Sequence, residues 1–276
     1  MDEAKQSDGN PPETAAAGER RAQAGVACGI AVMAKASAAG RTKTRLVPPL
    51  TYDAAAALNT AFLRDIADNL LLAGRHAAIV GYAAYAPLGS KDFFSRILPP
   101  AIGLIDACLS NFGDCLLRAT EEILARGHSA AVVLNSDSPT LPTALLVETA
   151  DVLAQPGERA VLGPSSDGGY YLLGLKTAHR RMFADIAWST EQVAAQTLER
   201  AREIALDVHV LPVWYDVDDV DGLRRLDAEL RRPRASSPRL DRNEPYFPAV
   251  TAALMARLCT DGEFAGGRAG VATESA

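Results

Sequence analysis

The sequence predicts an α/β fold in which a mainly parallel central sheet is covered by helices on both faces. The main observation is an alternation along the chain: short apolar runs rich in Val and Ile are followed by longer segments with apolar residues at helical spacing. The length of 276 residues, with 48% hydrophobic and 22% charged residues, suits one large globular domain. No repeat of fixed period interrupts the alternation.

The predicted strands are short apolar runs of the kind found in buried sheets. The first is VACGIAVM, residues 26–33, which ends at a loop containing Lys and Gly. Five more strands are expected at 77–82, 130–135, 159–164, 170–175 and 207–213.

The predicted helices have recognisable ends. In the helix expected at 52–73, Thr51 is a candidate N-cap and Gly74 a stop, and the pair Pro48-Pro49 prevents an earlier start. A helix over 142–155 carries Pro142 in its first turn. Further helices are expected at 111–126, near 190–204, at 220–232 and at 245–260.

Composition divides the chain into three parts. Residues 1–24 are polar and lack periodicity, which predicts a disordered leader. Residues 25–232 form the predicted domain, and 233–276 form an extension that is partly helical or disordered. Tyr246 and Phe247 in this extension could pack on the domain or on a second subunit, so a homodimer is an open alternative.

Charge and cysteine content limit the functional classes. The net charge of −6 gives no global attraction for nucleic acid, so no nucleic-acid partner is expected. The sequence shows no apolar run long enough for a membrane span and no apolar core of a signal peptide. The absence of a CxxC pair favours reduced thiols, which predicts a cytoplasmic protein; the four cysteines are Cys28, Cys108, Cys115 and Cys259.

A basic loop follows the first predicted strand. Residues 35–45 include no acid and carry four cations, Lys35, Arg41, Lys43 and Arg45. Because the loop follows a strand, it is expected at the carboxyl edge of the sheet, where open α/β sheets bind ligands. Cations beside the small residue Gly40 suit a di- or triphosphate. The alternative is a solvated basic loop.

Two aspartate-containing segments also follow predicted strands. Asp137 comes just after the strand 130–135 and could bind Mg²⁺ or Mn²⁺ through its carboxylate; alternatively, Asp137 or Ser138 caps the next helix. In the segment 214–221, Asp216 and Asp218 are the better candidates for a second metal carboxylate. Asp219 and Asp221 are expected at the start of a helix, where acids are favoured.

The segment GPSSDGGYY, residues 163–171, allows two interpretations. Asp-Gly-Gly between two apolar runs is typical of a hairpin turn. The length of the loop and its two tyrosines also fit the wall of an acceptor pocket. The four histidines are predicted to be surface residues, and the motifs of serine hydrolases, P-loop nucleotidases and classical dehydrogenases are absent; the histidines are His76, His128, His179 and His209.

Five segments in order resemble a bacterial family of A-type-fold (GT-A) glycosyltransferases, often called radical-SAM/selenodomain-associated transferases. They are AKASAAGRTKTRLVPPLT, NSDSPTL, GPSSDGGYYLLGL, IAWST and YDVDDVDGLRRL, and they cover roughly residues 26–230. The resemblance implies the Rossmann-like fold of the nucleotide-diphospho-sugar transferase superfamily, with three layers in the order α/β/α, and a divalent-metal site. Three positions depart from the family pattern: Ala38, Asn135 and Thr140.

The resemblance also implies roles for individual residues. Lys35, Lys43 and Arg45, with Ala34, Gly40 and Ser136, would bind the nucleotide. Asp137 with Asp216 or Asp218 would hold Mg²⁺ or Mn²⁺. Asp137, Asp167 and Lys43 would take part in catalysis, with Asp167 as the candidate general base. The acceptor side would be formed by Gly168, Gly169, Tyr170, Trp188, Ser189 and Thr190.

The function expected from these roles is a metal-dependent transfer from a nucleotide-activated donor. The first version is a glycosyltransferase that uses a nucleotide-sugar and releases a nucleoside diphosphate. The alternative is a nucleotidyltransferase resembling guanylyltransferases, in which a phosphate of the acceptor attacks a nucleoside triphosphate and pyrophosphate leaves. A third alternative is a catalytically silent nucleotide-binding module. Fold alone cannot choose among them.

Overall fold

The structure is a computed structural model, and it describes residues 27–233, 240–262 and 264. The leader predicted at 1–24, and most of the predicted extension beyond residue 262, lie outside the described residues. The predicted domain boundaries therefore stay predictions. None of the described helices combines the length and the apolar character needed to span a bilayer.

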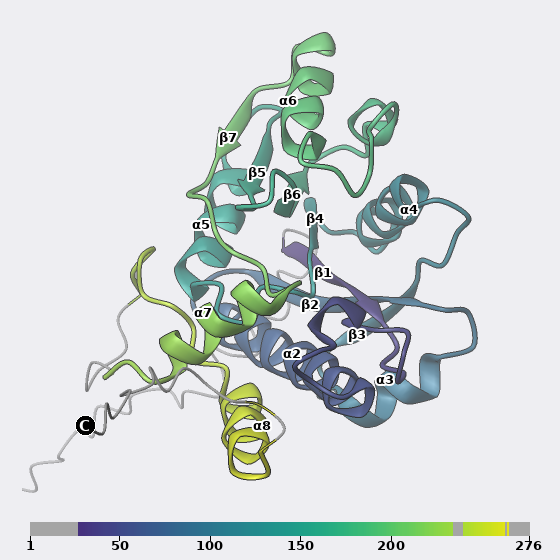
Figure 1. The fold of residues 1–276 in the computed structure, drawn as a ribbon. Coiled ribbons are helices and arrows are strands. Elements are labelled where there is room, and N and C mark those ends of the chain that lie inside the picture. Colours follow the sequence, from purple (N-terminus) through teal and green to yellow (C-terminus); the bar gives the residue numbers. More distant parts are fainter. Residues whose placement is uncertain (1–26, 234–239, 263, 265–276) are drawn as a thin grey trace, which may run out of the picture.

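The described strands form one mixed, mainly parallel sheet of seven strands in the order β3-β2-β1-β4-β6-β5-β7 (Figure 1). Only β6 runs against the others, since it pairs antiparallel with both β4 and β5. The strands are β1 (Cys28–Lys35), β2 (Ile79–Ala86), β3 (Gly103–Asp106), β4 (Ala130–Leu134), β5 (Ala160–Pro164), β6 (Tyr170–Leu175) and β7 (Val208–Val210).

Helices cover both faces of the sheet, as predicted (Figure 1). Alternation along β1 sends Ile30 and Val32 into a core with α2 and α5, and Ala31 into a second core with α4 and α6. The helices are α2 (Tyr52–Ala73), α3 (Lys91–Ile97), α4 (Phe112–Ala125), α5 (Thr143–Ala154), α6 (Val193–Glu203), α7 (Val220–Leu230) and α8 (Ala249–Thr260), with short 3-10 helices η2 (Thr44–Leu46) and η3 (Arg180–Phe183).

A third core joins the C-terminal helix to the rest of the chain. Leu254, Met255 and Leu258 of α8 pack with the start of α2 and with α7. The carboxylate of Asp65, a fully buried residue of α2, accepts hydrogen bonds from the backbone N–H groups of Val250 and Thr251 at 2.9 and 2.7 Å. These two donors are among the free N–H groups of the first turn of α8, so Asp65 caps α8 from a neighbouring helix.

Several local predictions are confirmed and others are wrong. Thr51 caps α2 by accepting a hydrogen bond from Ala54 N, and Asp219 caps α7 by accepting one from Gly222 N. Neither β3 nor α3 was predicted. The prediction of a surface position is wrong for His128, because its ring is buried and its Nε2 lies 2.6 Å from the Tyr82 hydroxyl oxygen; burial lowers the pKa of this imidazole.

Candidate active site

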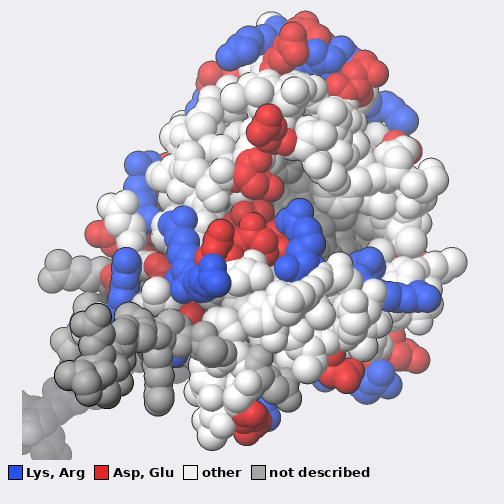
Figure 2. Space-filling view, in the orientation of Figure 1, with Lys and Arg blue, Asp and Glu red and all other residues white. Residues whose placement is uncertain are grey.

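Several loops meet at the edge of the sheet where the parallel strands end. The loops after β1 and β4 and the segment after β7 lie at this edge, together with the turn between β5 and β6. Backbone hydrogen bonds join them: Val217 N donates to Asp137 O at 2.8 Å, and Ser166 N donates to Trp214 O at 3.0 Å. Figure 2 shows acidic side chains gathered at the centre of this face, with basic side chains on both sides and a recess beside them.

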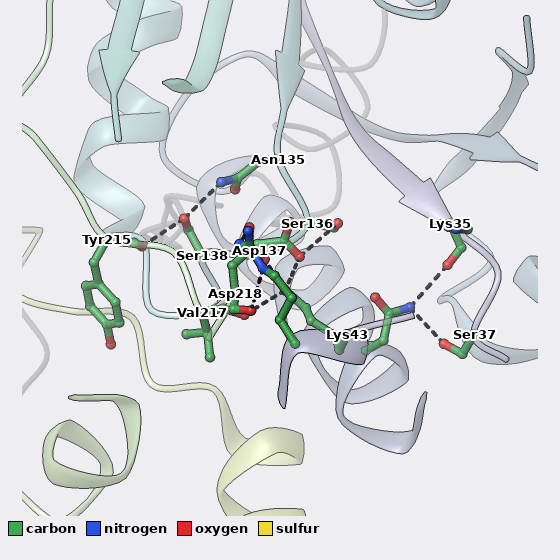
Figure 3. Close-up of polar contacts among 12 residues, drawn as sticks. Lys35, Ser37, Lys43, Asn135, Ser136, Asp137, Ser138, Tyr215, Val217 and Asp218 are labelled. Carbon is green, nitrogen blue, oxygen red and sulfur yellow. Dashed lines mark hydrogen bonds and ion pairs between the residues drawn. The ribbon is translucent and has the colours of Figure 1, made fainter. Parts of the chain in front are cut away.

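Lys43, in the loop after β1, forms hydrogen bonds with residues of two other loops at this edge. Its backbone has a left-handed φ of 52° just before η2, and its side chain is only 4% exposed. The ammonium group donates to the carboxylate of Asp137, to Val217 O at 2.8 Å and to Asp218 Oδ1 at 3.0 Å (Figure 3). An ammonium has three donors, and all three have partners here.

The charges of this cluster shift the pKa values of two of its members. Burial alone would lower the pKa of Lys43, but the carboxylates of Asp137 and Asp218 outweigh burial and raise it. Burial raises the pKa of Asp216 to about 6, and the nearby charges of Asp167, Asp218 and Asp137 add to the shift. Lys43 is therefore held as a cation, and the Asp216 carboxyl group keeps its proton to a higher pH than an ordinary aspartate does.

The carboxylates fit a divalent cation in their chemistry. Asp137, Asp216 and Asp218 offer the hard oxygen ligands that Mg²⁺ and Mn²⁺ prefer, and Asp216 forms no ion pair with any described residue. However, among the residues that the structure describes, no three Asp, Glu, His or Cys side chains lie close enough together to hold a metal ion. The place between Asp137 and Asp218 is taken by the ammonium of Lys43.

The remaining residues predicted to bind the nucleotide include four at the end of β1 and in the loop that follows it. Arg45 is 70% exposed, and its guanidinium lies 3.3 Å from Asp218 Oδ2. Lys35 donates through Nζ to Arg41 O at 3.0 Å. Gly40 has a φ of 71° with open space around it, so its backbone conformation rather than a close neighbour favours glycine. Ala34 is buried in the core, so only its backbone could contact a ligand.

Residues that were not predicted hold the basic loop in place. Asn59 of α2 is 5% exposed, and its amide donates to Lys35 O at 3.1 Å and to Ser37 Oγ at 2.8 Å. Thr60 also donates to Ser37 Oγ, at 2.7 Å. In the sequence, the signal that could have indicated this role is a polar residue, Asn59, next to the apolar face of the helix predicted over 52–73.

The loop after β4 does not cap α5, so the alternative interpretation of Asp137 and Ser138 is wrong. α5 begins after Pro142 without a side-chain cap. The Ser138 hydroxyl instead donates to Tyr215 O at 2.9 Å and accepts from the Asn135 amide at 3.2 Å. Ser136 donates to Asp137 Oδ1 at 3.3 Å. These contacts aim the Asp137 carboxylate at Lys43.

The residues predicted on the acceptor side lie together. β5 and β6 form the predicted hairpin, and its turn packs on the segment 188–194. A Cβ at Gly168 would lie 2.1 Å from Glu191 O, and its φ is +89°, so only glycine fits there. The ring of Trp188 packs edge-to-face on the ring of Tyr170. Gly169 N donates to Asp167 Oδ1 at 2.9 Å, and Ser189 (φ 66°) and Thr190 follow Trp188 in an exposed turn.

Comparison with known proteins supports the fold and its broad class. The model of a family described as "Uncharacterized protein conserved in bacteria (DUF2064)" matches residues 69–190. Among curated proteins, no sequence matches this chain. The narrower resemblance to radical-SAM/selenodomain-associated transferases stays a prediction.

Three solved structures illustrate the similarity. A proposed nucleotide-diphospho-sugar transferase from Desulfovibrio desulfuricans G20 has 28% sequence identity and a TM-score of 0.70, covering 86% of this chain and 96% of its own. A cytidylyltransferase from Leptospira borgpetersenii has 9% identity and a TM-score of 0.50, covering 86% and 95%. Rv0371c from Mycobacterium tuberculosis H37Rv, in complex with manganese, has 17% identity and a TM-score of 0.42, covering 73% and 97%. This last similarity is too distant to bear on the metal site here.

Proposed function

We propose that this protein is a transferase that uses a nucleotide-activated donor, and that the donor is a nucleotide-diphospho-sugar. The observation that carries the proposal is the meeting of Lys43, Asp137 and Asp218 at the carboxyl edge of the sheet. The 28% identity to the Desulfovibrio protein, over most of both chains, supports the same class.

The basic loop is placed to bind the diphosphate of the donor. Arg45 and Lys35 are exposed beside the acidic cluster, and Lys43 provides a buried cation behind them. Arg45 can pair with phosphate oxygens in a bidentate manner, whereas each lysine acts as a point charge. The backbone of Ala34 and Gly40, with the hydroxyl of Ser136, completes the proposed nucleotide side.

Asp137, with Asp216 or Asp218, is proposed to hold Mg²⁺ or Mn²⁺. The bound cation would neutralise the charge that develops on the leaving diphosphate. Asp137 and Asp218 also pair with Lys43, so a metal ion bound by both of them competes with the ammonium of Lys43. A buried cation beside developing negative charge stabilises it more strongly than it would in water.

The turn 165–169 and the segment 186–192 are proposed to form the acceptor side. Asp167 is exposed there, and the charge of its carboxylate adds to the raised pKa of Asp216. Only its Oδ1 takes the hydrogen bond from Gly169 N, so Oδ2 is available to accept a proton from an acceptor. Trp188, Ser189 and Thr190 would close over the bound acceptor.

Thermal-shift measurements and product analysis test this function. Nucleotide-sugars, nucleoside diphosphates and nucleoside triphosphates are each added with and without Mn²⁺, because a ligand of the native state raises the melting temperature. We expect metal-dependent stabilisation by one nucleotide-sugar, followed by release of a nucleoside diphosphate with an acceptor. Release of pyrophosphate from a triphosphate would establish nucleotidyl transfer instead. Metal-independent nucleotide binding without turnover would indicate a silent binding module.

A further inference from the structure

Trp188 joins three segments on the acceptor side. Its ring centroid lies 5.4 Å from that of Phe112 and 6.4 Å from that of Tyr170, both edge-to-face. Gly113 allows the close packing, since a Cβ there would lie 2.8 Å from Trp188 Nε1. The start of α4, the start of β6 and the segment 186–192 therefore lie around one indole ring.

These three segments contribute negative charge only. Residues 108–114, 165–170 and 186–192 contain Asp114, Asp167 and Glu191, and no Lys, Arg or His. The turn that carries Asp167 packs on the segment after β7, since Ser166 N donates to Trp214 O at 3.0 Å. The cations Lys43 and Arg45 of the basic loop pair with Asp218 rather than with these three acids. An anion that approaches from the Trp188 side thus meets carboxylates first.

The same side also exposes apolar surface. Leu109 and Phe112 are each 51% exposed, although both side chains are large and apolar. The ring of Phe112 packs edge-to-face on the ring of Trp188, which is itself only partly buried. Figure 2 shows a recess beside the acidic side chains at the centre of this face. Exposed aromatic rings that pack on one another are typical of ligand-binding surfaces.

We propose that the acceptor is an uncharged, hydroxyl-bearing molecule with a flat apolar group that packs against Trp188 and Phe112. This inference rests on the proposed function and narrows it. Asp167, together with Asp114 and Glu191, disfavours acceptors that carry a phosphate or a carboxylate next to the reacting hydroxyl. Nucleotidyl transfer to a phosphorylated acceptor is disfavoured by the same charges.

In the proposed transfer, the bond that forms is matched by a bond that breaks, and the proton has an acceptor. The acceptor oxygen forms a bond to the anomeric carbon of the donor sugar, and the bond from that carbon to the diphosphate oxygen breaks. The electron pair of the broken bond leaves on the nucleoside diphosphate. The hydroxyl proton passes to Oδ2 of Asp167, whose Oδ1 is held by Gly169 N.

Two matched probes test the inference by binding alone. The sequence contains two tryptophans, so in the variant Trp214→Phe the fluorescence reports on Trp188 only. This protein is titrated with phenyl β-D-glucopyranoside and with phenyl β-D-glucuronide, which differ by one carboxylate. We expect the glucoside to bind about tenfold more tightly, a ratio that one or two nearby like charges produce at a partly exposed site. Asp167→Asn should reduce that ratio, whereas Asp207→Asn, at the opposite edge of the sheet, should not.

A second pair of variants tests the aromatic surface. Phe112→Ala should weaken binding of the glucoside several-fold, and Val210→Ala, at a side chain equally exposed but on β7, should leave it unchanged. The inference is overturned if the glucuronide binds as tightly as the glucoside. It is also overturned if neither probe changes Trp188 fluorescence in protein that a nucleotide-sugar stabilises. If no nucleotide-sugar stabilises the folded protein, the proposed function itself fails and the inference fails with it.

Discussion

The ammonium nitrogen of Lys43 lies 3.0 Å from Asp218 Oδ1, although 175 positions separate the two residues in the chain. The same nitrogen contacts Asp137, so one side chain occupies the place between the two carboxylates proposed to hold a metal ion. Lys43 and a divalent cation cannot both occupy this place. A cation that binds both carboxylates must displace the ammonium, and Lys43 then becomes available to the diphosphate of the donor.

Removing the ammonium should therefore strengthen metal binding. In Lys43→Met we expect the affinity for Mn²⁺, without nucleotide, to rise about tenfold, which corresponds to about 1.4 kcal/mol. The two carboxylates lose their shared counter-ion in this variant, so its melting temperature should fall without metal and recover with Mn²⁺. Calorimetric titration and Mn²⁺ paramagnetic resonance measure the affinity directly.

Lys35→Met provides the matched control, because Lys35 belongs to the same loop but bonds to Arg41 O rather than to a carboxylate. Its affinity for Mn²⁺ should equal that of the unmodified protein. If Lys43→Met binds Mn²⁺ no better than Lys35→Met, displacement of Lys43 by the metal is ruled out.

Asp137→Asn should abolish the metal dependence of nucleotide binding. The amide keeps the shape of the side chain but removes the charge that both the proposed metal and Lys43 require. We expect turnover to fall by at least about 10²-fold, as when an electrostatic group is removed from a reacting site. Circular dichroism should show that the fold is retained.

Asp221→Asn is the control for that experiment. Asp221 is 88% exposed in the first turn of α7 and pairs with Arg224 of its own helix. Full activity in Asp137→Asn, or an equal loss in both variants, would contradict a special role for Asp137.

The layers of the fold could be predicted because alternating apolar runs and helical segments are local signals. The predicted helix over 52–73 matches α2, and the strand over 170–175 matches β6. β3 was missed because it has four residues, GLID, and α3 because it has seven. Elements this short carry no more than about two periods of a pattern. Their places are determined by packing on β2 instead.

The edge of the sheet that carries the candidate site could also be predicted, since Lys43, Asp137 and Asp218 each follow a predicted strand. The pairing of these residues could not. From sequence patterns, Lys43 is expected to bind phosphate and Asp218 to bind a metal ion. No local sequence pattern shows that these two side chains, 175 positions apart, are in contact. Asn59 was missed for a similar reason: its partners, Lys35 O and Ser37 Oγ, lie in a different element.

The raised pKa of Asp216 predicts how stability depends on pH in metal-free protein. Its ordinary pKa is 3.8, and in the folded protein the value is about 6. Between these values the folded protein holds a proton that the unfolded chain releases, so the stability contributed by the protonated form is lost as the pH rises through 6. Asp216→Asn, which carries no charge at any pH, should match the unmodified protein near pH 4 and exceed its melting temperature at pH 7.

Asp221→Asn serves again as the comparison, because its carboxylate lies almost entirely in solvent. Both variants lose one carboxylate, so a change in melting temperature with pH that is found in Asp216→Asn alone belongs to the site. A constant difference for Asp216→Asn over the same range would show that Asp216 ionises normally in the folded state.

Asn59→Leu tests whether α2 positions the basic loop for nucleotide binding. The substitution leaves Lys35 O and Ser37 Oγ without the Asn59 donor and should lower the free energy of unfolding by about 1–3 kcal/mol. Because Lys35 and its neighbours are then less firmly held, nucleotide affinity should fall as well. Urea unfolding and nucleotide titration measure the two effects separately.

Ile123→Val is the control, because Ile123 of α4 is fully buried in the core on the other face of the sheet. This substitution should lower the free energy of unfolding by about 0.5–1.5 kcal/mol and leave nucleotide affinity unchanged. Equal nucleotide affinity in both variants would mean that the loop keeps its conformation without Asn59.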